Sequence, residues 1–191
     1  YTNEIKLIYD IFTDAKFIHI LRDGRDVSTS LIKQSWGPGS LMKAISYWKE
    51  NIMCARKMGS MLPKENYLEI RFEELVNNPV LIMKNVTDFL GIEFENSMLS
   101  NYREKYYSVL PESSRQFHKN LVREIDPGLA YGWKDKMSRI DQLICSEIAG
   151  DVFKELGYPV PDIKLSSWIL DFKKLYYVAK ERAAWRINKL R

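Results

Sequence analysis

The stretch from Lys16 to Lys33 constrains the fold of this 191-residue chain more than any other. Phe17-Ile-His-Ile-Leu21 is a short apolar run, typical of a buried strand, and we interpret His19 as packed within it. Arg22-Asp-Gly-Arg-Asp26 follows as a polar turn, and a helical pattern resumes from Val27. Strand, turn and helix in this order form half of a βαβ unit, which predicts an α/β fold with a parallel sheet flanked by helices.

Hydrophobic periodicity and turn residues outline the rest of the chain. The helical spacing of Ile5, Ile8 and Phe12 predicts a helix over residues 4–13, ahead of the first strand. Tyr67-Leu-Glu-Ile-Arg-Phe72 alternates and contains strand-forming residues, which predicts a second strand. Gly-Pro-Gly cannot continue a helix, so we expect a loop at 36–39. The remaining expectations are helices over 40–58, 79–90 and 141–156, and irregular structure over 100–132.

The polar turn carries the residues with the clearest chemistry. A helix start offers backbone N–H groups and the positive end of the helix dipole, so it attracts an anion. Arg22 can grip a phosphate through two hydrogen bonds, and Ser30 can point its hydroxyl back toward the helix start. Spacing alone leaves a second interpretation open, a solvated turn in which Arg22 and Arg25 pair with Asp23 and Asp26.

Residues 17–30 also resemble the 3′-phosphate-binding motif of sulfotransferases that use 3′-phosphoadenosine 5′-phosphosulfate (PAPS), especially the bacterial kind. In that family the first Arg and the Ser eight residues later bind the 3′-phosphate, which implies Arg22 and Ser30 here. Arg25 in the same motif is a further candidate for nucleotide binding. Phe72 takes the place of a family tyrosine beside the adenine, where its ring can pack on the base or simply join the core.

The resemblance extends along most of the chain. It implies a P-loop nucleoside-kinase-like α/β fold and in-line transfer of a sulfuryl group from PAPS to an acceptor hydroxyl or amine. The expected partners are the nucleotide donor and an unidentified acceptor, and no metal is expected. The further matching blocks, in the family's order, are 36–38, 67–79, 89–91, 131–134 and 156–158.

Two features depart from the family pattern. The Gly-rich loop that holds the 5′-phosphosulfate is missing, so the chain is expected to be a C-terminal portion, incomplete at its N-terminus, that turns over slowly or not at all by itself. Asp126-Pro-Gly128 stands near a family Arg-Lys-Gly group, with Lys119 and Arg123 as the nearby basic residues. The catalytic residue is not identified; His118 is a candidate, with a surface histidine as the alternative. A non-catalytic remnant or a nucleotide-responsive binding protein is the alternative function.

Charge separates the C-terminal end from the rest of the chain. The chain carries a net +4, but residues 164–191 hold eight basic and two acidic residues, which leaves −2 for residues 1–163. This distribution argues against a nucleic-acid binder. We therefore expect a partial sulfotransferase-like domain over 1–163 and a basic amphipathic helical tail over 164–191. The tail has three interpretations: docking on its own domain or a sister subunit, peripheral contact with an anionic membrane, or a frayed extension.

The two cysteines and the hydropathy pattern bear on the compartment. Cys54 and Cys145 have no metal-like spacing, and we interpret them as buried free thiols, which favours a reducing environment. No apolar run is long enough to span a bilayer, and the start lacks a signal-peptide pattern. We expect a cytoplasmic protein, with a peripheral membrane location as the alternative.

Overall fold

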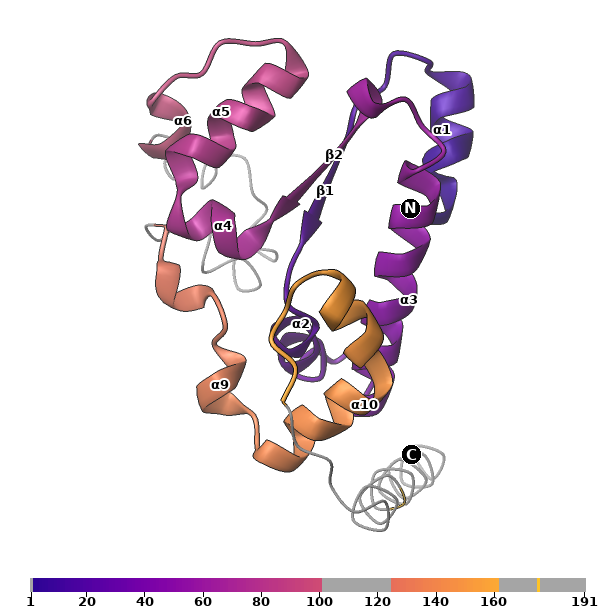
Figure 1. Ribbon diagram of the computed structural model, residues 1–191, viewed down its shortest axis with the longest axis vertical. Coiled ribbons are helices and arrows are strands. Elements are labelled where there is room, and N and C mark those ends of the chain that lie inside the picture. Colours follow the sequence, from indigo (N-terminus) through magenta and orange to yellow (C-terminus); the bar gives the residue numbers. More distant parts are fainter. Residues whose placement is uncertain (1, 101–124, 162–174, 176–191) are drawn as a thin grey trace. The chain divides into compact units, whose positions relative to one another are not determined.

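The computed structural model describes residues 2–100, 125–161 and 175. Figure 1 shows that the described elements are helices and two short strands. This is an α/β fold, as predicted. The elements are η1 (Thr2–Glu4), α1 (Ile5–Ile11), β1 (Phe17–Leu21), α2 (Gly24–Leu31), α3 (Leu41–Gly59), η2 (Lys64–Asn66), β2 (Tyr67–Arg71), α4 (Phe72–Asn77), α5 (Pro79–Leu90), α6 (Ser97–Ser100), η4 (Pro127–Leu129), α9 (Trp133–Lys136) and α10 (Arg139–Glu155).

The chain divides into two compact units. Unit 1 is formed by residues 3–21 and 58–130, and unit 2 by residues 22–57 and 131–191, with Thr2 assigned to unit 2. Both strands therefore belong to unit 1, whereas α2, α9 and α10 belong to unit 2. The predicted tail over 164–191 lies outside the described residues except for Leu175, which is exposed.

The sheet of unit 1 confirms the predicted pair of parallel strands. β1 and β2 pair in parallel, with Phe17 opposite Tyr67 and Leu21 opposite Arg71. On one face, Ile70 forms a buried core with two residues of α5, Ile82 and Val86, and Leu68 and Leu75 pack against this core. A helix that follows β2 in the chain therefore packs on this strand, whereas Ile18 and Ile20 of β1, on the same face, are exposed.

The other face of the sheet carries a polar cluster. The Nδ1 atom of His19 lies 2.7 Å from the Tyr67 hydroxyl, and that hydroxyl donates to Glu69 Oε1 at 3.1 Å. His19 is half-buried, so the predicted packed strand histidine is held by polar neighbours rather than by apolar ones alone. The Tyr67 ring also lies against Gly59, where a Cβ atom would come within 2.3 Å of it. A side chain at the end of α3 would thus collide with the start of β2.

Helix α4, like the short helices α6 and α9, was absent from the sequence expectations. The second strand was predicted to include Phe72, but this residue begins α4, directly after β2. The alternation of the strand ends there, and Glu73 and Glu74 occupy the first helical turn, where the helix dipole favours acidic residues. The helix at 79–90 is confirmed as α5, with Pro79 in its first turn and Gly91 at φ 75° after its end.

The core of unit 2 lies where α3 meets α10. Trp48 of α3 and Phe153 of α10 have ring centroids 5.1 Å apart, and both side chains are buried. Lys49 of α3 donates to the Ile148 carbonyl and forms an ion pair with Asp151 at the edge of this contact. α10 begins at Arg139, two residues before the predicted start, because Ser138 is its N-cap and accepts from the Asp141 N–H.

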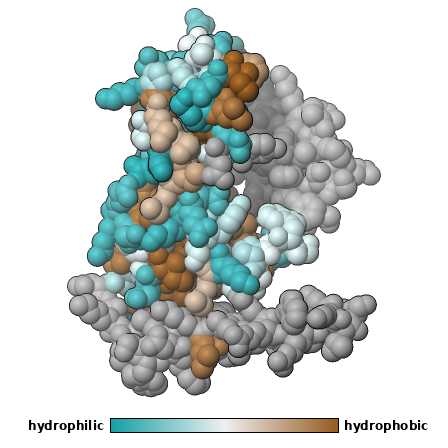
Figure 2. Space-filling view, turned by 90° about the vertical axis from the view of Figure 1, so that its right-hand side faces the viewer, coloured by the Kyte–Doolittle hydropathy of each residue, from teal (hydrophilic) through white to brown (hydrophobic). Residues whose placement is uncertain are grey.

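The surface is mixed. Figure 2 shows hydrophobic patches separated by hydrophilic residues on the face drawn. Within unit 1, α1 contributes Leu7 and Ile11 to the exposed apolar residues, and Phe12 follows them directly. Among the described residues, no helix combines the length and the apolar character needed to cross a membrane.

The two thiols differ in burial, and this predicts a difference in reactivity. Cys145 in α10 is fully buried, and the loss of solvation raises its pKa to about 12, whereas Cys54 in α3 is half-buried. Because the thiolate is the reactive form, we expect a thiol reagent at pH 8 to modify Cys54 in the native protein and Cys145 only after unfolding. Peptide mapping of the labelled protein measures this; equal labelling rates in the native protein would contradict the described burial of Cys145.

Candidate functional site

The predicted site lies at the turn that leads from β1 into α2. The helix begins at Gly24, earlier than the sequence pattern suggested, because Asp23 is its N-cap. The Oδ1 atom of Asp23 accepts a hydrogen bond from the Arg25 backbone N–H at 2.9 Å. Such a cap satisfies a backbone donor that the helix itself leaves unpaired. The first cap of α2 is thereby supplied from within the turn itself.

Asp23 also forms a buried ion pair with Arg25. The Arg25 guanidinium donates from Nε to Asp23 Oδ1 at 2.9 Å and from Nη2 to Oδ2 at 2.7 Å. Its Nη1 atom donates to the Pro159 carbonyl at 2.8 Å. Both charged side chains are 0% exposed. A charge pair can be buried only when hydrogen bonds replace the lost water, and here every nitrogen of the guanidinium has an acceptor.

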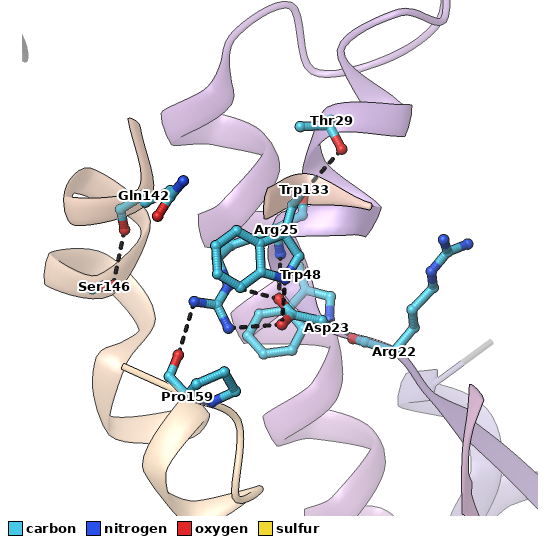
Figure 3. A network of polar contacts seen from close by, with 9 residues as sticks. All are labelled: Arg22, Asp23, Arg25, Thr29, Trp48, Trp133, Gln142, Ser146 and Pro159. Atoms are coloured by element: carbon cyan, nitrogen blue, oxygen red, sulfur yellow. Dashed lines mark hydrogen bonds and ion pairs between the residues drawn. The ribbon is translucent and has the colours of Figure 1, made fainter. Parts of the chain in front are cut away.

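Aromatic rings pack against this ion pair, and Figure 3 draws Trp133 as one of them. The guanidinium carbon of Arg25 lies 3.7 Å from the ring centroid of Trp133 and 4.6 Å from that of Phe153. The Trp133 indole also donates from Nε1 to Asp23 Oδ2 at 2.9 Å. The interpretation of a solvated turn is therefore wrong for this pair, because Asp23 and Arg25 do pair but lie in the interior of unit 2.

Arg22 differs from Arg25 in both burial and direction. It is half-buried, and in Figure 3 its side chain points away from the Asp23–Arg25 network. Its backbone carbonyl accepts a hydrogen bond from Trp48 Nε1 at 3.0 Å. The same Trp48 ring lies flat against Gly24, where a Cβ atom would come within 2.5 Å of it. Only glycine fits at this position of the turn.

Asp26 lies in the first turn of α2 and interacts electrostatically with Arg22, which precedes the helix. Residues four apart lie on one face of a helix, so Asp26 and Ser30 share a face. The Asp26 carboxylate interacts electrostatically with Arg22 and Lys136 and accepts from the Trp133 backbone N–H. Burial nevertheless raises the pKa of Asp26, since loss of solvation outweighs these stabilising contacts.

Two cationic side chains act on Asp26 at the first turn of α2, those of Arg22 and Lys136. Asp23 and Arg25 neutralise each other inside unit 2. The cations beside Asp26 and the positive end of the helix dipole both favour the approach of an anion.

The predicted site residues differ in their surroundings. Arg22 precedes the N-cap residue Asp23, and Ser30 is exposed in the last turn of α2. Arg25 lies inside the network, and a direct nucleotide contact by it would require that network to open. Phe72 is half-buried at the start of α4 in unit 1, and His118, like Lys119 and Arg123, lies outside the described residues.

Sequence reasoning missed the two tryptophans that hold the turn. Trp133 is buried, and its indole N–H donates to Asp23. A buried indole N–H needs a hydrogen-bond acceptor. The sequence can suggest that a tryptophan is buried, but it does not show which residue accepts from its N–H. Across the described ranges, no three His, Cys, Asp or Glu side chains lie together as metal ligands would.

The buried ion pair predicts that removing Arg25 lowers the stability of the protein more than removing Arg56, an arginine in an exposed ion pair. Arg25→Ala leaves the Asp23 carboxylate buried without its counter-charge, so we expect the free energy of unfolding to fall by about 3–5 kcal/mol. Arg56→Ala is the control, because its ion pair with Glu155 is exposed and should contribute less than about 1 kcal/mol. Urea denaturation followed by circular dichroism measures both; equal losses for the two variants would contradict the role assigned to the buried pair.

The raised pKa of Asp26 predicts a pH-dependent gain from its neutralisation. Since the folded-state pKa lies above the ordinary value of 3.8, the native state binds more protons in that interval and the charged form is disfavoured above it. Asp26→Asn should therefore raise the melting temperature at pH 8, and the gain should decline as the pH falls through the raised pKa and be lost near the ordinary value of 3.8. Thermal melts from pH 3 to 8 measure this; a gain that grows toward acid would reverse the sign and contradict the assignment.

Comparison with known proteins identifies the family. A family model described as "Sulfotransferase family" matches residues 1–96, just over half of the chain. The sulfotransferase domain from the Synechococcus PCC 7002 olefin synthase superposes with a TM-score of 0.61 at 25% identity, over 77% of this chain and 50% of that one. The sulfotransferase domain from the curacin biosynthetic pathway gives a TM-score of 0.67 at 22% identity, over 84% of this chain and 60% of that one.

A curated relative is also named as a sulfotransferase. Protein-tyrosine sulfotransferase A of Caenorhabditis elegans is 24% identical over 95 residues, which is 47% of this chain. The chain spans 25% of the length of that relative, and half to three fifths of the two solved domains. The α/β fold and the family match agree with the motif at the start of α2, and we conclude that this chain belongs to the sulfotransferase family.

Proposed function

We propose that this chain forms the part of a PAPS-dependent sulfotransferase that binds the 3′-phosphate of the donor. The observation that carries the proposal is the contrast between the two arginines of the turn. Arg25 is consumed by Asp23, whereas the Arg22 side chain points out of that network at the start of a helix. A guanidinium held at a helix N-terminus is suited to a phosphate group.

Ser30 and the local charge support the same assignment. Ser30 is exposed on the helix face that Asp26 shares, and its hydroxyl can donate to a phosphate oxygen. The cationic side chains of Arg22 and Lys136, which both act on Asp26, favour an anion at this end of α2. In this proposal Arg22 and Ser30 contact the 3′-phosphate, and Arg25 acts by supporting the turn.

The proposed contribution to catalysis is positioning. PAPS supplies a sulfuryl group, which passes to an acceptor hydroxyl or amine while 3′,5′-bisphosphoadenosine leaves. Arg22 and Ser30 hold the ribose-side phosphate and so fix the donor relative to the acceptor, which lowers the entropic part of the barrier. We further propose that the whole domain has a nucleoside-kinase-like P-loop fold in which the 5′-phosphosulfate is held by groups outside this site, and that Phe72 packs against the adenine.

Removing the Arg22 guanidinium tests the proposal. Arg22→Ala should weaken binding of 3′,5′-bisphosphoadenosine by on the order of 1.5–3 kcal/mol, the usual contribution of a hydrogen bond to a charged group. Binding of 5′-AMP, which lacks the 3′-phosphate, should change little. Isothermal titration calorimetry measures both affinities.

Arg56→Ala provides a control of equal charge change, since Arg56 pairs with Glu155 and lies two turns along α3 from Trp48. It should bind both nucleotides as the unaltered chain does. Unchanged affinity of Arg22→Ala for the bisphosphate, or an equal loss for both nucleotides, would show that Arg22 does not read the 3′-phosphate.

A further inference from the structure

We infer that Trp48 and Trp133 are positioning residues, which hold the turn so that Arg22 is presented to the 3′-phosphate; this inference rests on the proposed function. The two tryptophans come from different helices, α3 and α9, and both are buried. Each donates its indole N–H to a different residue of the turn. Trp48 Nε1 donates to the Arg22 carbonyl at 3.0 Å, and Trp133 Nε1 donates to the Asp23 carboxylate at 2.9 Å.

The first contact fixes the backbone of Arg22 directly. A hydrogen bond to the Arg22 carbonyl restrains the peptide that links Arg22 to Asp23, and with it the direction in which the Arg22 side chain leaves the chain. The Trp48 ring also packs flat on Gly24, at a distance that no Cβ atom would allow. One side chain of α3 therefore restrains two positions of the turn, on either side of the N-cap.

The second contact, from Trp133 of α9, holds the N-cap residue Asp23. Trp133 holds Asp23 through its indole N–H, covers the Arg25 guanidinium with its ring, and donates its backbone N–H to Asp26. These three contacts tie α9 to the first turn of α2. They leave Arg22 as the arginine of this turn whose side chain points out of the network (Figure 3).

A packing role and a positioning role of the two tryptophans predict different effects of substitution. Phenylalanine can fill most of the volume of either tryptophan, but it cannot donate to the Arg22 carbonyl or to Asp23. A role in packing alone lowers stability and leaves the preference for the 3′-phosphate intact. A role in positioning lowers that preference, because Arg22 then samples orientations that miss the phosphate.

The test is a double-mutant cycle that measures only the contribution of the 3′-phosphate to the binding affinity. The measured quantity is the ratio of affinities for 3′,5′-bisphosphoadenosine and 5′-AMP, determined by calorimetry on the full chain. Trp133→Phe and Trp48→Phe should each lower this ratio by about three- to tenfold, the range of one lost hydrogen bond. In an Arg22→Ala background, the same substitutions should change the ratio by less than about twofold, because the group that they position is gone.

The control is Ile144→Val, which removes a buried methyl group from α10 and none of the hydrogen bonds to the turn. It should lower the melting temperature and leave the ratio unchanged, so a loss of stability is not mistaken for a loss of positioning. The two tryptophan variants are independent, so either one that folds decides the question.

The outcomes separate this inference from the proposed function. If Arg22→Ala leaves the ratio unchanged, the proposed function fails and the inference fails with it. If Arg22→Ala lowers the ratio but neither tryptophan variant does, the 3′-phosphate assignment stands and the positioning role is overturned. Equal effects of the tryptophan substitutions with and without Arg22 would also overturn it, since the tryptophans would then act through some other group.

Discussion

The site in unit 2 depends on the buried ion pair between Asp23 and Arg25. Burying two charges is unfavourable unless hydrogen bonds replace the lost solvation, and here both partners are fully enclosed. Asp23 accepts from the Arg25 backbone, from its guanidinium and from Trp133, while Pro159 takes the remaining guanidinium nitrogen. One pair thereby links α2, α9 and the segment after α10. Removing either charge would leave the other unpaired in an apolar interior.

The same pair explains why two arginines three residues apart have different tasks. Helix α2 begins at Gly24, so Arg25 lies in the first helical turn and faces the core of unit 2, whereas Arg22 precedes the N-cap and faces away from it. Side chains on the two sides of an N-cap leave the backbone in different directions. In our account, the internal arginine neutralises Asp23 and the other arginine offers its charge to a ligand.

The sequence predicted the elements that local patterns encode and missed the contacts made over long separations. The strands around Phe17 and Tyr67 were predicted from alternation and β-branched content, and α5 from its proline start and glycine end. The direction of Arg25 could not be predicted, because its partners Trp133 and Pro159 lie more than 100 positions away in the chain. The sequence assigned Arg22 to the 3′-phosphate and left Arg25 as a further nucleotide-binding candidate, and only tertiary packing shows that Arg25 is buried against Asp23. Helix α4 was missed because the strand pattern passes into it without a turn residue.

A crystal structure of the protein with 3′,5′-bisphosphoadenosine tests the central claim most directly. Our account predicts the 3′-phosphate within hydrogen-bonding distance, about 3 Å, of the Arg22 guanidinium and the Ser30 hydroxyl. It also predicts that Arg25 still binds Asp23 and Pro159 in the complex. A 3′-phosphate bound elsewhere, or one that draws Arg25 out of its network while Arg22 stays in solvent, would contradict the account.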